Sequence, residues 1–329
     1  DHLDAFLPVG FYYKQFHKPR WLWPIFEHTV RHIAGLGRID VNAAPAAEAE
    51  IEYLHADVCV VGGGPSGLAA AETAASAGAS VLLIDRQPRL GGHLLGTQYS
   101  APSTALSAQH WSHVEKLSAS LTLHPQARIL SDTTVFGLYE GNLLGAFQKN
   151  RFIKIRAKQI IVCTGSRERP FVFHNNDLPG IMLGRGVLRL AQLYGVLAGK
   201  RAVVFTENDE GLVLAGQLTA LGIEVAAVVD RRSSVDTQGG DLRATVGGLV
   251  LSGSTVVSAR GGNHLKAVAV AAVLPDGTAD AKTTQEIACD LLCMAPTPVP
   301  TNELLLQAGV RYRIEGGSSR LMKTSTCCP

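Results

Sequence analysis

Charged side chains are scarce in this chain. Asp, Glu, Lys and Arg make up 18% of its 329 residues, and the formal net charge is only +2. Nucleic-acid-binding proteins carry a broad basic surface, which this balance does not indicate. The longest apolar tract is interrupted by a glycine cluster and Pro65, so the sequence predicts no membrane-spanning helix. No signal peptide is visible, and the chain begins at Asp1 without a methionine.

Cysteine is also infrequent, and its six copies do not form a disulfide framework. Cys59 and Cys163 lie in apolar, strand-like segments and are interpreted as small core residues. Cys289 and Cys293 have a spacing that matches no zinc or iron–sulfur pattern. The sequence contains no Cys-x-x-Cys pair and no Gly-x-Ser-x-Gly elbow, and His28 and His32 have no further metal ligand at a suitable spacing and are interpreted as surface or packing residues, so no catalytic or metal-binding residue is predicted. A reducing, cytoplasmic location is expected, and any redox chemistry would belong to a bound cofactor.

Glycine, in contrast, is abundant, with 34 copies, and its most informative cluster follows the apolar run Val58–Val61. Gly62 permits a tight turn, Gly64 lets the backbone approach a pyrophosphate, and Gly67 lets the following Ala-rich helix pack closely on the strand. A second apolar strand, Val81–Ile84, completes a βαβ unit. A glycine-rich turn without a ligand is the alternative, but the complete strand–helix–strand context favours a dinucleotide site.

The residues around this cluster predict how the nucleotide lies. The pyrophosphate is expected on free N–H groups at the start of the helix, beside Pro65 and Ser66. Asp85 ends the second strand at the spacing typical of the carboxylate that accepts from a ribose hydroxyl. Arg86 is able to meet a 2′-phosphate, but the neighbouring acid favours a free 2′-hydroxyl because like charges repel. We therefore expect an ADP-ribose or FAD-type adenosine half rather than NADP.

Three further segments resemble two-dinucleotide-binding flavoproteins of the glutathione reductase type. Gly91 and Gly92 are similar to the pair that runs beside the pyrophosphate there. The ending Thr164-Gly165 of a buried strand is similar to the segment that returns beside the nucleotide, and Val135 lies where such folds place a backbone group against the adenine edge. The sequence thus predicts an α/β protein with a Rossmann fold of this type.

A second strand–helix–strand unit follows, with strands at 202–205 and 225–229 and a helix at 210–220. Its turn, Thr206–Gly211, lacks paired glycines and brings three carboxylates to where a pyrophosphate would lie. Like charges repel a phosphate there, so this unit is expected not to bind a nucleotide in the ordinary way.

The predicted organisation has three parts. Residues 1–50 form an aromatic-rich arm and linker, residues 51–170 form the dinucleotide-binding domain that 285–329 complete, and residues 171–284 form the second, degenerate domain. The arm either covers an apolar face of the main body or contacts another subunit. Between the second strand and the strand at 127–131, a helix is expected over 105–118 and a short strand over 121–124.

Four stretches together resemble the α subunit of heterotetrameric sarcosine oxidase and the large subunits of related amine and opine dehydrogenases. The similarity runs from about residue 7 to 294. Its most specific part is RERPFVFHNNDLPGIML, which a Rossmann fold in general does not require. The stretches are LPVGFYYKQF with the following Trp-Pro and AGLG, ADVCVVGGGPSGLAAA, TGSRERPFVFHNNDLPGIML, and RAVVFTENDEG with EVAAVVDRR.

The resemblance implies a nucleotide-binding α component that works with a β subunit, which carries the amine-oxidising FAD, and with smaller subunits. Such complexes convert sarcosine to glycine with one-carbon transfer and hydrogen peroxide formation. It implies NAD or FAD in the first Rossmann site, and a second flavin, FMN, at the subunit boundary of the assembled complex. The residues implied to hold the dinucleotide are Gly62, Gly64, Pro65, Ser66, Gly67, Asp85, Arg86, Gly91, Gly92, Val135, Thr164 and Gly165.

The chain begins near the FYYK segment and ends soon after the second unit. We therefore expect a fragment without the ferredoxin-like and aminomethyltransferase-like domains of the family, and without catalysis of its own. Two other functions stay open at this point: a free-standing FAD- or NAD(P)H-dependent reductase, and a non-catalytic assembly subunit. The degenerate second loop counts against the reductase.

Overall fold

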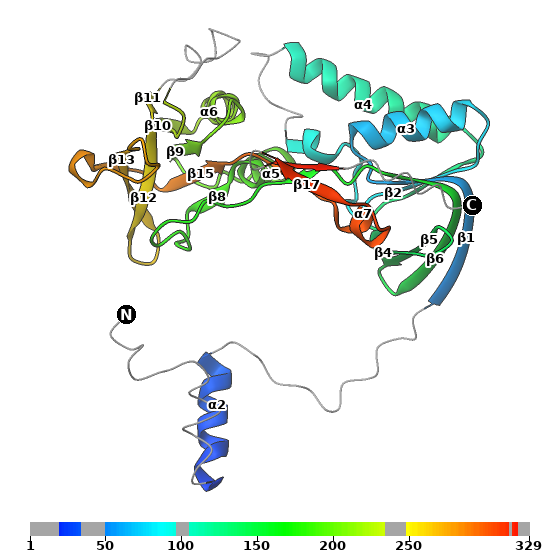
Figure 1. Cartoon of the computed structure of the whole chain (residues 1–329), viewed down its shortest axis with the longest axis horizontal. Coiled ribbons are helices and arrows are strands. Elements are labelled where there is room, and N and C mark those ends of the chain that lie inside the picture. The colour runs from blue at the N-terminus through cyan, green and yellow to red at the C-terminus, as the bar shows by residue number, and fades with distance from the viewer. Residues whose placement is uncertain (1–19, 34–49, 97–104, 234–247, 316–317, 322–329) are drawn as a thin grey trace. The chain divides into compact units, whose positions relative to one another are not determined.

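The computed structural model describes residues 20–33, 50–96, 105–233, 248–315 and 318–321 (Figure 1). The chain divides into two compact units, Asp1–Glu48 and Ala49–Pro329. In the first unit a short 3-10 turn, η1 (Arg20–Leu22), leads into helix α2 (Trp23–Ile33). Pro24 lies in the first turn of α2, where its missing N–H costs nothing. The FYYK segment of the arm lies outside the described residues.

The unit Ala49–Pro329 has two halves, each built on a largely parallel sheet. The first half contains a six-stranded sheet in the order β3-β2-β1-β6-β5-β4. β3, β2, β1 and β6 are mutually parallel, and β5 and β4 add an antiparallel hairpin at one edge. The strand order 3-2-1 is that of a Rossmann half, in which helices connect parallel strands. The strands are β1 (Glu50–Val61), β2 (Val81–Ile84), β3 (Ala127–Leu130), β4 (Thr134–Tyr139), β5 (Leu143–Gln148) and β6 (Arg151–Val162).

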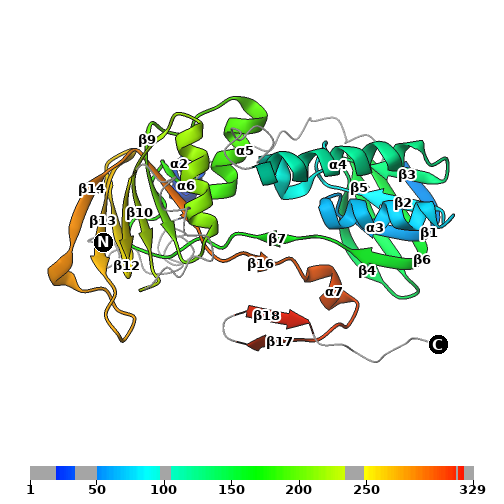
Figure 2. The ribbon, with the colours of Figure 1, turned by 90° about the horizontal axis from the view of Figure 1, so that it is seen from above.

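Helices α3 (Pro65–Ser76) and α4 (Ala105–Leu123) lie side by side along this sheet (Figure 2). The strand expected over 121–124 is wrong, because α4 continues to Leu123. Val114, Leu117 and Leu121 recur at helical spacing, and all three pack into the cluster that contains Leu68 of α3. The apolar stretch at 121–123 is too short for its own pattern to indicate a helix, and packing against α3 stabilises it as the last turn of α4.

The central strands β1 and β6 are each 12 residues long and pair in parallel over almost their whole length. The sequence indicated only the buried end of β1, around 58–61, and predicted two separate strands, over 152–156 and 158–165, where the structure has the single strand β6; the second of these was expected to be buried, but residues 158–162 are exposed or half-buried. The outer half of β1 alternates between exposed and half-buried positions, and in β6 the fully buried Ile153 and Ile155 alternate with the half-buried Lys154 and the exposed Arg156. Such alternation is typical of a sheet with one solvated face.

The second half contains a fully parallel five-stranded sheet in the order β11-β10-β9-β15-β8. Helices α5 (Gly184–Tyr194) and α6 (Glu210–Ala220) pack on it, and a three-stranded antiparallel sheet, β12-β13-β14, completes the core. The strands are β8 (Ile181–Leu183), β9 (Arg201–Thr206), β10 (Glu224–Asp230), β11 (Leu249–Ser252), β12 (Ser254–Gly261), β13 (Leu265–Ala272), β14 (Gln285–Ala288) and β15 (Leu291–Ala295).

Two antiparallel segments, β7 (Ser166–Arg167) and β16 (Val299–Pro300), connect the two sheets and run side by side (Figure 2). After β16 the chain returns to the first half as the short helix α7 (Glu303–Gln307), followed by the hairpin of β17 (Tyr312–Glu315) and β18 (Ser318–Leu321). The predicted α/β class is confirmed. In the described part of the chain, no helix combines the length and hydrophobicity that crossing a membrane requires.

Candidate dinucleotide-binding site

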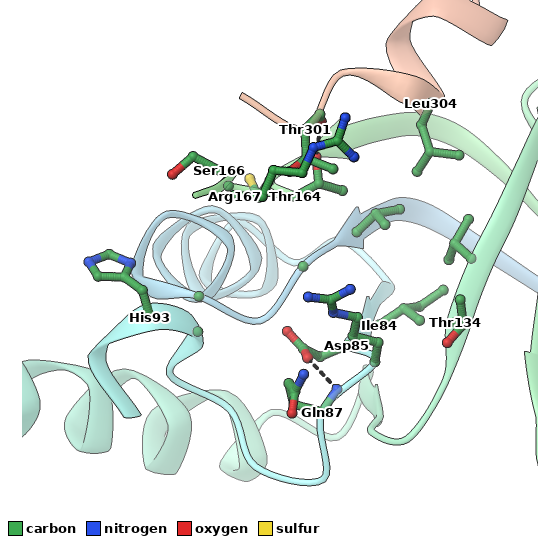
Figure 3. Close-up of a pocket in the computed structure, with 18 of the residues that line it drawn as sticks. Ile84, Asp85, Gln87, His93, Thr134, Thr164, Ser166, Arg167, Thr301 and Leu304 are labelled. Atoms are coloured by element: carbon green, nitrogen blue, oxygen red, sulfur yellow. Dashed lines mark hydrogen bonds between the residues drawn. The ribbon is translucent and has the colours of Figure 1, made fainter. Parts of the chain in front are cut away.

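A cavity of about 590 Å³ lies at the carboxyl ends of β1, β2 and β6. Parallel sheets bind nucleotides at this edge, where strand order reverses. Figure 3 shows Ile84, Asp85 and Gln87 along the end of β2, with Thr134 at one end and His93 at the other. The volume falls in the range of pre-formed cofactor pockets.

The glycine loop is too crowded for side chains. A Cβ on Gly62, whose φ is +108°, would lie 2.2 Å from the carbonyl oxygen of Cys163. A Cβ on Gly67 would lie 1.8 Å from the carbonyl oxygen of Gly62, and one on Gly92 would lie 2.9 Å from Cα of Gly64. These contacts explain why glycine is required for the turn, for the strand–helix packing, and for the approach of the two loops.

The start of α3 offers unused hydrogen-bond donors to the cavity. Gly64, at the N-cap, has no side chain to cap the first turn, and that turn carries no acidic residue. Pro65 and Ser66 both line the cavity. The free N–H groups and the positive end of the helix dipole fit a pyrophosphate. The residues present therefore fit the phosphate portion of a dinucleotide.

Asp85 lines the cavity and is 8% exposed, but its carboxylate is already engaged. Oδ2 accepts from the backbone N–H of Gly63 at 2.5 Å, and Oδ1 accepts from that of Gln87 at 2.6 Å. A carboxylate has about four lone-pair sites, so each oxygen keeps capacity for a ribose hydroxyl. The sequence spacing predicted only a ribose contact for Asp85. It did not predict these bonds to backbone N–H groups, which hold the glycine loop against the end of β2.

Ten of the twelve residues predicted to hold the cofactor line this one cavity, while Gly67 and Gly91 do not. Gly67 supports the turn from behind, and the N–H of Gly91 donates to the carbonyl of Gly63 at 2.8 Å. Their positions indicate a role in shaping the loops. The ten residues are Gly62, Gly64, Pro65, Ser66, Asp85, Arg86, Gly92, Val135, Thr164 and Gly165.

Sequence reasoning missed the lining residues that come from distant segments. Some follow or begin a strand, as Thr133 and Thr134 do, and their position after β3 was a usable signal. Others come from α5 and from the returning chain near α7, for which no local motif exists. Arg167, which the sequence offered either as a site charge or as part of a solvated turn, also lines the cavity. The missed polar residues are Gln87, His93, Thr133, Thr134, Ser166, Arg185, Arg189, Thr301, Glu303 and Gln307.

The returning chain closes one side of the cavity through three contacts. The hydroxyl of Thr164 donates to the carbonyl of Thr301 at 2.7 Å. Arg167 pairs with Glu303 at 2.6 Å, and both side chains are largely exposed. The side chain of Gln307 in α7 accepts from the backbone N–H of Leu138 in β4 at 2.8 Å. These contacts attach the returning chain, residues 301–307, to the end of β6 and to β4.

Beside the cavity, Glu168 caps the start of α5. Its carboxylate accepts from the backbone N–H of Arg185 at 3.2 Å. Burial raises the pKa of Glu168, although the positive charge and the N–H of Arg185 oppose the shift. The guanidinium of Arg185 donates to Ser166 Oγ at 3.3 Å and pairs with Glu210 at 3.2 Å.

The turn Thr206–Gly211, in the second strand–helix–strand unit, is filled by its own side chains. Thr206 Oγ1 donates to the carbonyl of Ala295 at 2.9 Å, and a Cβ on Gly211 would lie 2.3 Å from the Thr206 side chain. The carboxylates expected to repel a phosphate are not free: Asp209 pairs with Arg232 at 2.9 Å, and Glu210 pairs with Arg185. Side chains that fill the turn, and carboxylates that are already in ion pairs, therefore describe this loop better than charge repulsion does.

No group of three or more potential metal-ligating side chains is found among the described residues. The cysteines there are free. Burial raises the pKa of the Cys59 and Cys289 thiols to about 12, and it also raises the pKa of Cys163, which lines the cavity. Thiols held protonated in this way are poor nucleophiles. The predicted core position holds for Cys59, whereas Cys163 is half-buried just after β6 and lines the cavity.

Comparisons with known proteins agree with this geometry. The sarcosine oxidase α subunit of Rhizobium meliloti (strain 1021) is 35% identical over 308 residues, or 89% of this chain and 29% of that protein. The α subunit from Corynebacterium sp. (strain P-1) is 38% identical over 73% of this chain and 26% of its own length. This chain thus spans less than a third of these relatives.

Among solved structures, L-proline dehydrogenase from P. horikoshii superposes with a TM-score of 0.65 at 21% identity. The match covers 86% of this chain and 50% of that one, which shows a shared fold. The family model "Pyridine nucleotide-disulphide oxidoreductase" matches residues 56–321. The similarity to sarcosine oxidase α subunits that the sequence motifs indicated is confirmed. This chain belongs to the pyridine nucleotide-disulphide oxidoreductase family, and its two Rossmann-type halves are those of an FAD- or NAD-binding oxidoreductase.

Proposed function

We propose that this chain is the nucleotide-binding component of a multi-subunit, flavin-dependent amine oxidoreductase of the sarcosine oxidase type. The observation that carries the proposal is the cavity at the end of the first sheet, where the glycine loop, the uncapped start of α3 and Asp85 meet. In the proposed role, Ser66 and the neighbouring N–H groups hold the pyrophosphate, and Asp85 accepts from the adenosine ribose. A bound NAD or FAD would supply the adenosine anchor and, in the case of FAD, a two-electron redox ring.

The amine-oxidising step is assigned to a partner rather than to this chain. Neither carboxylate that lines the cavity is free to take a proton, because Glu303 is paired with Arg167 and Asp85 is bonded to backbone N–H groups. We infer a β subunit with its own FAD, smaller subunits, and FMN at the subunit boundary of the assembled complex. Sarcosine-type secondary amines are the proposed substrates of that complex.

A free-standing reductase is the less favoured function. It needs a second working nucleotide site for NAD(P)H, whereas the turn at Thr206–Gly211 is filled by its own side chains. An assembly subunit that holds a nucleotide without redox chemistry agrees with the same cavity, and whether the chain purifies with a partner separates the proposed component from both alternatives.

The experiment is to purify the chain, release any bound small molecule by heat, and record its absorbance and mass. A colourless extract that contains NAD supports the proposed component. A yellow extract with FAD redirects the function toward a self-contained flavoprotein. A chain that arrives empty and binds neither NAD nor FAD in titrations contradicts the assignment of the cavity.

A further inference from the structure

Helix α5 belongs to the second half, yet one of its faces borders the nucleotide cavity of the first. Arg185 and Arg189 are four residues apart, which places them on one side of the helix, and both line the cavity. Gln192 follows on the same side and is only 8% exposed. Its Nε2 has no hydrogen-bond partner among the described residues. This face of α5 is therefore rich in hydrogen-bond donors.

The two arginines differ in their partners. Arg185 pairs with Glu210 at 3.2 Å, so its charge is compensated. Arg189 instead donates from Nη2 to the side-chain oxygen of Gln87 at 2.8 Å, and an amide carries no charge. None of the ion pairs formed by the described residues includes Arg189. A half-buried guanidinium without a carboxylate partner is costly, and an anion that reaches it is correspondingly stabilised.

Gln87 holds the guanidinium in place. Its own N–H is bonded to Asp85 Oδ1, and its carbonyl accepts from the N–H of Asp132 at 3.2 Å, so the residue is fixed at both ends. Arg189 also passes close to Gly96, where a Cβ would lie 3.4 Å from its Cγ. A guanidinium that is already oriented loses little conformational entropy when a ligand binds.

The carboxylates of the cavity do not cancel this charge. Glu303 pairs with Arg167 at 2.6 Å, and Asp85 contributes a single negative charge. Arg86, which also lines the cavity, takes part in none of the ion pairs of the described residues either. The uncompensated charge beside Gln87 is thus positive.

We propose that Arg189, presented by the second half and oriented by Gln87, binds a phosphate group of the adenine nucleotide in the first half. The inference rests on the proposed function, because it assumes that the cavity holds an adenine nucleotide. It also gives the degenerate second half a direct part in that site. The phosphate is either in the pyrophosphate or a 2′-phosphate on the ribose, and a guanidinium suits both.

The test is calorimetric titration of the full chain with three probes: adenosine at millimolar concentration, ADP-ribose, and 2′-phospho-ADP-ribose. Arg189→Gln is expected to weaken ADP-ribose binding by about 10- to 100-fold, as the loss of a charged hydrogen bond implies, and to leave adenosine binding unchanged. Arg189→Lys is expected to recover part of the loss. Arg169→Gln is the matched control, because Arg169 is exposed and does not line the cavity.

The probes separate the two phosphates. A loss confined to 2′-phospho-ADP-ribose assigns Arg189 to the 2′-phosphate, and an equal loss for both phosphorylated probes assigns it to the pyrophosphate. Gln87→Ala keeps every charge and is expected to weaken ADP-ribose binding by less, with no further effect in the Arg189→Gln background. It tests the inference even if Arg189→Gln fails to fold, because unchanged ADP-ribose affinity in a folded Gln87→Ala chain contradicts the orienting role.

Two negative results have different meanings. If Arg189→Gln binds all three probes like the unaltered chain, the inference is overturned while the proposed function stands. If the unaltered chain binds none of the three, the proposed function fails and the inference fails with it.

Discussion

The carboxylate of Asp85 accepts a hydrogen bond from the backbone N–H of Gly63 at 2.5 Å, and so joins the end of β2 to the glycine loop after β1. In the variant Asp85→Asn, one oxygen becomes an NH₂ group that faces an N–H donor. We expect a loss of about 1–3 kcal/mol in the free energy of unfolding, which is the cost of an unsatisfied buried donor, measured by urea denaturation. Asp177→Asn, at an exposed position, is the control. Equal stability of the two variants would show that Asp85 serves only the ligand.

Gly67 tests the packing of α3 on β1 in the same way. Gly67→Ala places a methyl group 1.8 Å from the carbonyl oxygen of Gly62, so the loop must shift and ADP-ribose binding is expected to be lost. Gly186→Ala in α5 is the matched control: no atom lies within 4 Å of its Cβ, and alanine there is expected to stabilise the helix by about 0.5–1 kcal/mol. Thermal unfolding and ADP-ribose titration of both variants measure the difference. Retained binding by Gly67→Ala would contradict the crowded geometry.

The first βαβ unit was predictable because its signals are local. Buried parallel strands produce the continuous apolar runs at 58–61 and 81–84, and steric crowding restricts the turn to glycine. The helix expected over 210–220 is α6, for the same reason. Where a pattern was short, as at 121–124, tertiary packing against α3 decided the outcome, and no local pattern contains that information.

The polar contacts of the site were not predictable, because their partners lie far apart in the sequence. Arg189 meets Gln87 across 102 positions, and Thr164 meets Thr301 across 137. Spacing placed Asp85 at the cavity but gave no sign of its bond to Gly63. In the second strand–helix–strand unit, counting carboxylates suggested repulsion, whereas Asp209 is paired with Arg232, which lies 23 positions further along the chain, beyond α6 and β10. The sequence shows how many charged residues the loop contains, but it does not show which of them form ion pairs.

Asp57 gives a prediction about pH. It joins β1 to the segment before β2 and to β6, through Lys158 at 2.7 Å and the N–H and hydroxyl of Ser80 at 2.9 and 2.7 Å. The bond to Lys158, followed by those to Ser80, lowers the pKa of Asp57 in the folded chain. A lowered folded pKa stabilises the fold above the ordinary Asp range, and this contribution is lost as the pH falls through that range toward the folded pKa.

The variant Asp57→Asn is therefore expected to be less stable than the unaltered chain at neutral pH, with a difference that shrinks as the solution is acidified below the ordinary Asp pKa. Urea unfolding over a pH series measures it. Lys158→Met removes the first partner and should reproduce part of the effect, while Asp177→Asn, at an exposed position outside this network, should not. A difference that grows on acidification would reverse the assigned sign.

Cys163 reports directly on the cavity, because it lies at the end of β6 and lines the proposed nucleotide site. Burial raises the pKa of its thiol, so labelling by a maleimide at neutral pH is expected to be slow and to accelerate with rising pH as the thiolate forms. Cys293, which is fully buried, should react only after unfolding and serves as the internal reference. Peptide mass mapping assigns each labelled cysteine. ADP-ribose is expected to slow the labelling of Cys163, because a nucleotide that occupies the cavity blocks access to the thiol. An unchanged rate at saturating ADP-ribose would place the bound nucleotide away from the glycine loop.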